Sequence, residues 1–242
     1  MRAIPRRSLG LLSLAVLLAT ACGLSFDFGG PAVAGSGTVI TRPRPVPAFD
    51  HVAVGGDFDV TITAGPARDL TLTGDDNLLP LIETEVRGGT LHIDTDRNLR
   101  SNEPIRIVIT TPTLNGISSG GSSTIRVTGV RADRFEASVS GSSELTAAGQ
   151  VQELAASVSG SGDIAMTGAA QHVDGSVSGS GGLDLRRVRA LTASVRVSGS
   201  GDVTLHVTER LEAQVSGSGT VRYSGNPTVN SNISGSGSVE RV

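Results

Sequence analysis

The chain has 242 residues, a formal net charge of −3, 18% charged residues and a single cysteine. Its basic residues are all arginine, and a chain with this acidic balance is not expected to bind nucleic acid or an anionic lipid face. One cysteine cannot form an intramolecular disulfide, so the fold does not depend on cross-links.

An export signal is predicted at residues 1–21. Arg2, Arg6 and Arg7 precede an apolar run from residue 9 to 18, and small residues follow. The run is far shorter than the ~20 residues that a helix needs to cross a bilayer. This pattern is typical of a signal peptide and not of a transmembrane anchor.

The end of the signal, LATAC at residues 18–22, resembles the bacterial lipobox, in which the cysteine becomes the lipidated first residue of the mature protein. Ala19 departs from that pattern, which has a larger aliphatic residue there. We predict lipidation at Cys22. The protein would then be exported and anchored by its lipid to a membrane of the cell envelope, facing the periplasm or the surface. A secreted protein without lipid, or an uncleaved anchor, is the alternative. Residues 22–45, rich in Gly and Pro, predict a flexible tether behind the lipid.

A single β domain is predicted over residues 46–242, and its first part, 46–113, is irregular. This part contains stretches in which apolar residues occupy alternate positions, the period of a half-buried strand. Gly88 and Gly89 predict a tight turn, and segment 75–80 predicts a short helical turn or a bulge. We expect this part to be a β cap or the first coils of a stack. The predicted strands are 49–54, 58–63, 70–74, 82–86, 91–95 and 105–110.

Residues 114–242 repeat one motif, seen in VSGSGDV at 197–203, and a degenerate copy spans 117–125. Alternating apolar residues precede and follow each Ser-Gly element, which indicates two short strands joined by a glycine bend. A unit of about 19 residues cannot bury its apolar row alone, so the copies must stack. Including the copy at 197–203, the regular copies begin, 18 to 20 residues apart, at Val139, Val158, Val177, Val197, Val215 and Ile233.

Two architectures allow such stacking. In a parallel β-helix each repeat is one coil; in the alternative each Ser-Gly element is a hairpin tip of an antiparallel sandwich. The regular spacing, the small residues and the absence of Trp favour an all-β, right-handed parallel β-helix-like solenoid with 18–20-residue Ser-Gly-Ser-Gly coils and an N-terminal β cap. A left-handed helix needs a stricter six-residue register. In the β-helix, one ladder contains Ser140, Ser159, Ser178, Ser198, Ser216 and Ser234.

An ordered set of motifs resembles one known family. The set consists of FDVTI at 58–62, DNLLPLIETEV at 76–86, GTLHI at 89–93, the Ser-Gly repeats and YSGNP at 223–227. Together they resemble the bacterial head GIN domain family of autotransporter-adhesin-like lipoproteins, over roughly residues 49–242. The resemblance implies a right-handed parallel β-helix-like fold in an exported envelope protein. It brings no established activity, ligand or catalytic residue.

Carboxylates on neighbouring coils are the candidates for chemistry, because some parallel β-helices are polysaccharide lyases or hydrolases. Glu144 and Asp163 follow the bend at equivalent positions, and Asp202 lies two coils beyond Asp163. In register, Glu144 and Asp163 would lie side by side, able to contact a ligand or cation. Hydroxyl residues continue the column and no basic partner is fixed beside it, which favours an ordinary solvent-facing turn.

The other polar clusters predict no catalytic residue, metal or cofactor. The four histidines lack ligand spacing. The acidic pairs are interpreted as solvated faces, with a metal site as the alternative. Four nearby arginines are interpreted as a solvated bulge, with a site for an acidic glycan or phosphate as the alternative. The pairs are Asp57/Asp59, Asp75/Asp76 and Asp94/Asp96, and the arginines are Arg186, Arg187, Arg189 and Arg196.

We therefore expect a non-enzymatic cell-envelope lipoprotein whose rigid solenoid presents an interaction surface, adhesin-like or scaffolding. The expected partners are the membrane, through the N-terminal lipid, and an envelope protein or glycan. One Tyr and no Trp disfavour glycan binding by ring stacking, so hydroxyl and backbone groups would bind it. The alternatives are a polysaccharide-active enzyme that uses Glu144 and Asp163, and a sensory or regulatory module of the envelope.

Overall fold

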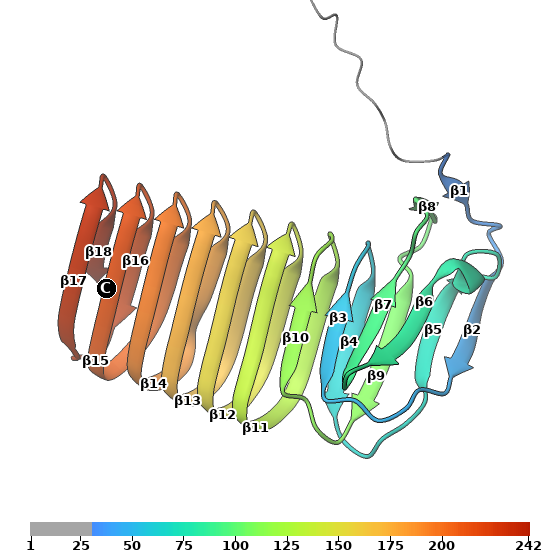
Figure 1. Cartoon of the computed structure of the whole chain (residues 1–242), viewed down its shortest axis with the longest axis horizontal. Coiled ribbons are helices and arrows are strands. Elements are labelled where there is room, and N and C mark those ends of the chain that lie inside the picture. The colour runs from blue at the N-terminus through green and yellow to red at the C-terminus, as the bar shows by residue number, and fades with distance from the viewer. Residues whose placement is uncertain (1–30) are drawn as a thin grey trace, which may run out of the picture.

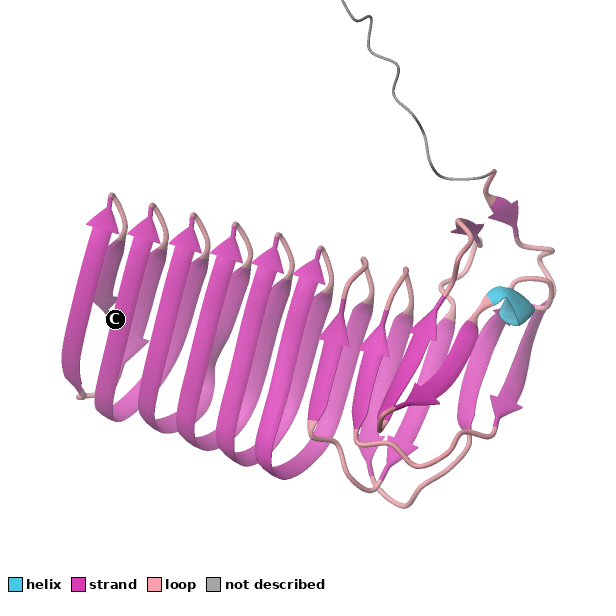
Figure 2. Ribbon diagram, in the orientation of Figure 1, coloured by secondary structure: helices cyan, strands magenta, loops and turns pink. Residues whose placement is uncertain are grey.

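The computed structural model describes residues 31–242, which form a right-handed β-solenoid. In Figure 1 the strands of the repeat coils run upward in a front sheet and downward in a back sheet, and successive repeat coils advance from right to left. Figure 2 shows that, within the described residues, strands are interrupted only by loops and one 3₁₀ turn, η1 (Leu79–Leu81). The predicted signal peptide and Cys22 lie outside this range. In residues 31–242 no helix has the length and apolar character to cross a membrane.

The strands at the N-terminal end of the stack are short and belong to one sheet each. Two of the short strands, β1 (Val33–Ala34) and β8 (Leu99–Arg100), pair only with each other and belong to neither the front nor the back sheet. The front sheet begins with β6 (Glu83–Arg87), β7 (Thr90–Asp94), β3 (His51–Val54) and β10 (Gly116–Ser119), and the back sheet with β2 (Val39–Arg44), β5 (Leu70–Asp75), β9 (Arg106–Thr111) and β4 (Asp59–Ala64).

The repeat region continues both sheets with long strands that pass from the back sheet round the lower edge of the stack into the front sheet (Figure 1). Each of these strands is therefore most of one coil. They are β11 (Thr124–Gly141), β12 (Glu144–Gly160), β13 (Asp163–Gly179), β14 (Gly182–Gly199) and β15 (Asp202–Gly217); the stack ends with β16 (Thr220–Ser224), β17 (Thr228–Gly235) and β18 (Ser238–Arg241).

The structure confirms the parallel solenoid and the predicted serine ladder. Ser140 is the register partner of Ser159, and the same row continues, coil by coil, to Ser234. The coils differ in length, but the register shifts lie near the opposite edge, as between Thr128 and Val130. The upper edge, where the Ser-Gly bends lie, therefore stays in register throughout the repeats.

The Ser-Gly bend keeps its register because two of its positions have room only for glycine. Gly160 has a φ of +133°, and a Cβ there would lie 2.7 Å from the carbonyl oxygen of Gly141. A Cβ on Gly162 would lie 2.5 Å from Ser143 O and 2.5 Å from Cγ1 of Val139. Neighbouring coils thus pack backbone against backbone at this edge.

Apolar columns fill the space between the two sheets. Inward-facing residues of successive coils stack on one another, and Phe135 is the largest fully buried side chain of the molecule's described part. This continuous column buries what a single coil leaves exposed. The back sheet contributes Ile125, Leu145, Ile164, Leu183, Val203 and Val221, and the front sheet Phe135, Leu154, Val173, Ala193 and Leu211.

The first coils are not stacked in chain order. Strand β3 pairs with β7 on one side and with β10 on the other, and β4 lies between β9 and β11. The coil made of β3 and β4 is therefore inserted between the coil made of β7 and β9 and the coil that β10 begins. Antiparallel strands β2, β5 and β6 flank the outermost coil. The irregular N-terminal part contains both the predicted cap and the first coils.

The segment predicted as a flexible tether is structured in its second half. Residues 39–44 form β2, which pairs with β5 along the whole strand, so the domain begins before residue 46. Polar groups hold the segment: Gly37 N donates to Asp75 Oδ1 at 2.7 Å, and Ser36 N donates to Asn77 Oδ1 at 2.9 Å. A composition rich in Gly and Pro indicates flexibility only where no neighbouring strand offers backbone partners.

Candidate functional site

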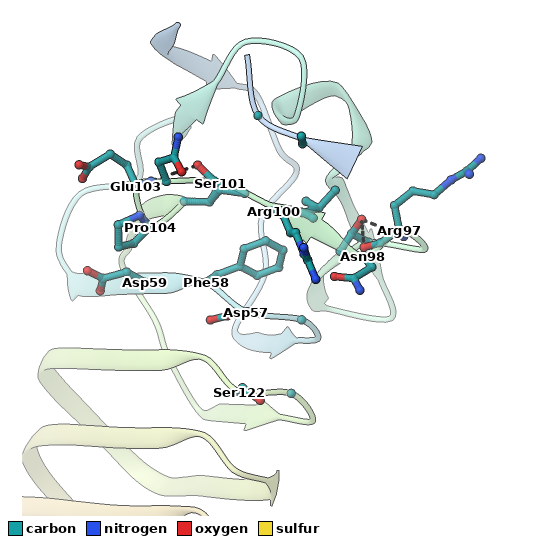
Figure 3. A pocket seen from close by; sticks show the side chains of 18 of the residues that line it. Asp57, Phe58, Asp59, Arg97, Asn98, Arg100, Ser101, Glu103, Pro104 and Ser122 are labelled. Atoms are coloured by element: carbon teal, nitrogen blue, oxygen red, sulfur yellow. Dashed lines mark hydrogen bonds between the residues drawn. The ribbon is translucent and has the colours of Figure 1, made fainter. Parts of the chain in front are cut away.

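A cleft of about 960 Å³ lies at the N-terminal end of the upper edge. We call the stack of bends that join the front sheet to the back sheet along this edge the bend row. The cleft has the loop 95–105 and residues 34–35 on one side and the bends at Gly56 and Gly121 on the other (Figure 3). Its volume lies within the range of ligand sites in proteins.

The cleft exists because the outermost coil has a long bend. In that coil residues 95–105 lead from β7 to β9 and carry β8, which pairs with β1 away from the stack. The outermost coil and its neighbour are normally spaced just before and just after this loop, since Gly55 N donates to Ile93 O at 2.8 Å and Asp59 N donates to Ile105 O at 3.0 Å. The chain between these two hydrogen bonds runs outward from the stack. The space that it leaves behind is the cleft.

A buried carboxylate fixes the outer wall of the cleft. The side chain of Asp75, which is 3% exposed, accepts a hydrogen bond from Ser101 Oγ at 2.5 Å and another from Gly37 N at 2.7 Å. These bonds tie loop 95–105 to the N-terminal segment. The interpretation of Asp75 and Asp76 as a solvated pair was wrong for Asp75, because its oxygens are used by groups distant in sequence.

Charged groups of both signs line the cleft. Asp59 pairs with Arg126 at 3.0 Å, whereas the carboxylates of Asp57 and Glu103 form no hydrogen bond or ion pair with any residue in 31–242. Of the two lining arginines, Arg97 lies 3.5 Å from Asp96, and Arg100 has no ion pair within the described chain. Figure 3 shows Arg100 extending from the loop toward the bend that holds Asp57.

The structure brings together the carboxylates that the sequence paired, but outside the cleft. Glu144 is the register partner of Asp163 on the exposed side of the back sheet. Asp163 Oδ1 accepts a hydrogen bond from Gly182 N at 2.8 Å, and Asp202 lies 3.6 Å from Arg222. In residues 31–242 no group of three His, Cys, Asp or Glu side chains is arranged to hold a metal ion.

The other predicted clusters have local partners. Arg186 donates to Asp184, and this hydrogen bond is the main reason that the pKa of the Asp184 carboxyl lies below its usual value. His51 Nδ1 lies 2.9 Å from Asp50 Oδ1, and this hydrogen bond is the largest cause of a lowered pKa of Asp50. His206 contacts Ser224 at 3.0 Å. These contacts fit the interpretation of surface groups that satisfy one another.

Sequence reasoning missed Arg100 and the loop that carries it. The signal was the long interval between the predicted strands 91–95 and 105–110, whereas the other coils make the same passage in a short glycine-containing bend. Compact surface loops of this size on a rigid scaffold are often functional.

The sequence profile described as "Putative auto-transporter adhesin, head GIN domain" matches residues 48–227, which is most of the chain. The chain belongs to this head GIN domain family. The sequence resemblance noted above is thereby confirmed, and so is the all-β solenoid fold. No curated protein matches the sequence.

Solved structures of other chains share the fold. A "putative adhesin" from Bacteroides fragilis is 28% identical with a TM-score of 0.83, and the match covers 87% of this chain and all of that one. A "putative lipid binding protein" from Parabacteroides distasonis is 25% identical with a TM-score of 0.71, covering 88% and 100% of the two chains. A "putative adhesin" from Parabacteroides merdae, 19% identical with a TM-score of 0.70, covers 88% and 100% and shows the fold alone. Family and fold fit an adhesin-like role in the cell envelope.

Proposed function

We propose that this head GIN protein is a lipid-anchored, non-enzymatic protein of the cell envelope that binds a ligand in the cleft at the end of its bend row. The observation that carries the proposal is the break in an otherwise regular stack. Regular coils repeat the same exposed groups, whereas the outermost coil departs from the repeat and forms a cleft in which Asp57, Arg100 and Glu103 have no ion-pair partner among residues 31–242. Such a departure in a rigid scaffold is the usual place for binding.

The lipid anchor is supported by the LATAC segment at residues 18–22 and by the signal-like residues that precede it. It is tested by Cys22→Ser in the producing cell, with metabolic labelling by a fatty acid and fractionation of the envelope. We expect the native chain to carry label and to sediment with membranes, and the variant to lose both. A labelled variant, or an unlabelled native chain, would contradict the anchor.

The enzyme alternative uses Glu144 and Asp163. Their exposed positions on a flat sheet face, and the use of Asp163 by the Gly182 amide, favour an ordinary turn column over a pair of acid and base groups. A screen of envelope and host polysaccharides for binding and for cleavage decides between the two. Cleavage that a folded Glu144→Ala/Asp163→Ala variant loses would replace the binding function by the enzyme.

A cleft variant completes the same screen. We expect a ligand found in it to bind at least tenfold more weakly to Glu103→Ala/Arg97→Ala, which changes two cleft residues, and unchanged to the carboxylate double variant. A ligand that binds both variants equally well would place the binding surface elsewhere on the solenoid.

A further inference from the structure

We propose that the cleft binds a short peptide that has a free terminal carboxylate and an ammonium group. The proposal rests on the binding function proposed above and names the chemistry of the ligand. It follows from an open backbone position in the bend row, from the guanidinium of Arg100 and from two unpaired carboxylates.

The open position is the amide of Asp57. In each later coil the equivalent amide donates to a glycine carbonyl of the coil before it: Ser122 N to Gly56 O at 2.9 Å, Ser142 N to Gly121 O at 3.1 Å, and so on to Ser236. Asp57 occupies the place of Ser122 in its own bend, because β3 and β4 are in register with β10 and β11. No residue of 31–242 accepts its N–H, since loop 95–105 has swung away. A ligand oxygen would take the place of the missing carbonyl.

The charge of that oxygen is set by Arg100. Its guanidinium extends toward the bend that holds Asp57 (Figure 3), and it has no ion pair within the described chain. A guanidinium and a free N–H that line the same cleft form a donor set suited to a carboxylate. Arg97, by contrast, lies 3.5 Å from Asp96 and is partly neutralised.

The ammonium group follows from the acids in the same cleft. Asp57 and Glu103 have carboxylates without partners among residues 31–242, so a ligand with only negative charge would meet repulsion beside Arg100. A cation on the ligand converts these acids into attractive contacts. Acidic sugars supply the carboxylate alone, whereas a peptide supplies the carboxylate, the ammonium and a backbone that resembles the missing bend.

The test uses the full chain in detergent micelles and calorimetric titration with tri-alanine, N-acetyl-tri-alanine and tri-alanine amide. We expect tri-alanine to bind, the amide to bind at least tenfold more weakly, and the acetylated peptide about threefold more weakly, because charge-assisted hydrogen bonds are stronger than neutral ones. Equal binding of tri-alanine and its amide, or no binding of tri-alanine, would overturn the proposal.

Variants locate the site. Arg100→Gln is expected to remove the preference for the free carboxylate over the amide, while Arg68→Gln, at an exposed arginine outside the cleft, keeps it. In a ¹⁵N-labelled chain, tri-alanine is expected to shift the amide resonance of Asp57 downfield more than that of Ser142, whose acceptor is already in place. A preference that survives Arg100→Gln, or an unmoved Asp57 amide, would contradict the assignment.

Free peptides and peptides attached to the cell wall share this chemistry. Sedimentation of the chain with purified cell-wall polymer, with and without tri-alanine as competitor, separates the two sources. If the polysaccharide screen finds a ligand in the cleft but tri-alanine does not bind, the peptide proposal fails while the binding function stands. If the cleft variants change the binding of neither the screened ligand nor tri-alanine, the peptide proposal and the proposed binding function both fail.

Discussion

The N-terminal coils and the repeat coils belong to the same two sheets but are assembled differently. In the repeats, register partners are about one coil apart in the chain, as with Val158 and Val177. In the first coils Val60 pairs with Ile125, although the chain between them builds the cap strands β5 and β6, the outermost coil and β10. Closing such a long loop costs more chain entropy and slows folding. A repeat therefore specifies its neighbours locally, whereas the first coils must find theirs across the domain.

The two regions are also held by different groups. The repeats rely on glycine positions that let backbones approach, and their exposed ion pairs contribute little. The N-terminal region relies on buried or partly buried side chains that bind backbone groups, such as Asp75 with Gly37 and Arg44 with the carbonyl of Leu79. Burial is the main reason that the pKa of Arg44 lies below its usual value. The lesson is that regular stacking needs space, and irregular closure needs specific polar contacts.

The largest effect is expected where the repeat needs space. Gly162→Ala would place a Cβ 2.5 Å from Ser143 O and from Val139 Cγ1, neither of which can move without shifting a coil. We expect a loss of about 3 kcal/mol or more in the free energy of unfolding, measured by denaturant titration. Gly120→Ala is the control, because the nearest atom to its Cβ, Ser140 Oγ, would be 3.8 Å away. Equal losses of stability in the two variants would contradict the conclusion that Gly162 is needed for the close approach of neighbouring coils.

The next effect tests the polar closure. Asp75→Ala leaves the Gly37 amide and the Ser101 hydroxyl without an acceptor, and we expect a loss of about 2 kcal/mol in stability. Amide exchange of residues 35–38 should rise more than that of the repeats. Asp69→Ala, at an exposed carboxylate without a hydrogen bond in the described chain, is the control. Uniform exchange across the molecule would show that the two regions are held together in another way.

The junction between the regions offers a coupled pair. Ser143 occupies the position that is glycine in later coils. Its hydroxyl lies 2.7 Å from Oγ of Ser119, and Ser119 is the register partner of Val139. Ser119→Val alone should cost about 2 kcal/mol by crowding Ser143, and Ser119→Val/Ser143→Gly should recover most of it. Thermal denaturation of the single and double variants gives the coupling. Additive effects would mean that the two positions do not share one space.

The smallest effect concerns a surface pair of the repeats. Because Arg186 lowers the pKa of Asp184 in the folded state, the pair stabilises the fold above the pKa of an unfolded Asp, and this contribution is lost as pH falls through the lowered value. Asp184→Asn should therefore cost less than about 0.5 kcal/mol near pH 7, since the pair is exposed. The difference from the native chain should shrink as pH falls below the ordinary pKa of an Asp and vanish once the folded carboxyl is protonated. A larger or pH-independent loss would indicate a structural role.

Much of the fold follows from the sequence, for reasons that the repeats make plain. Alternating apolar residues predict the strands from β3 to β7 and β9 within a few positions, but not β8, and the Ser-Gly spacing predicts the register of the ladder. The order of the first coils does not follow, because the β3–β4 coil carries the same alternation wherever it is inserted. The candidate site is missed for a related reason. Arg100 lies in a loop without periodicity, and the carboxylates chosen instead, Glu144 and Asp163, are regular members of a column.

The constancy of the upper edge has a consequence for how such molecules vary in length. Each repeat contacts mainly its two neighbours, and the bend row joins every coil to the next in the same way. Duplicating or deleting a whole coil changes neither the N-terminal cap nor the last strands. The distance between the two ends is therefore adjustable in steps of roughly 4.8 Å, the spacing of adjacent strands, while the cleft stays as it is.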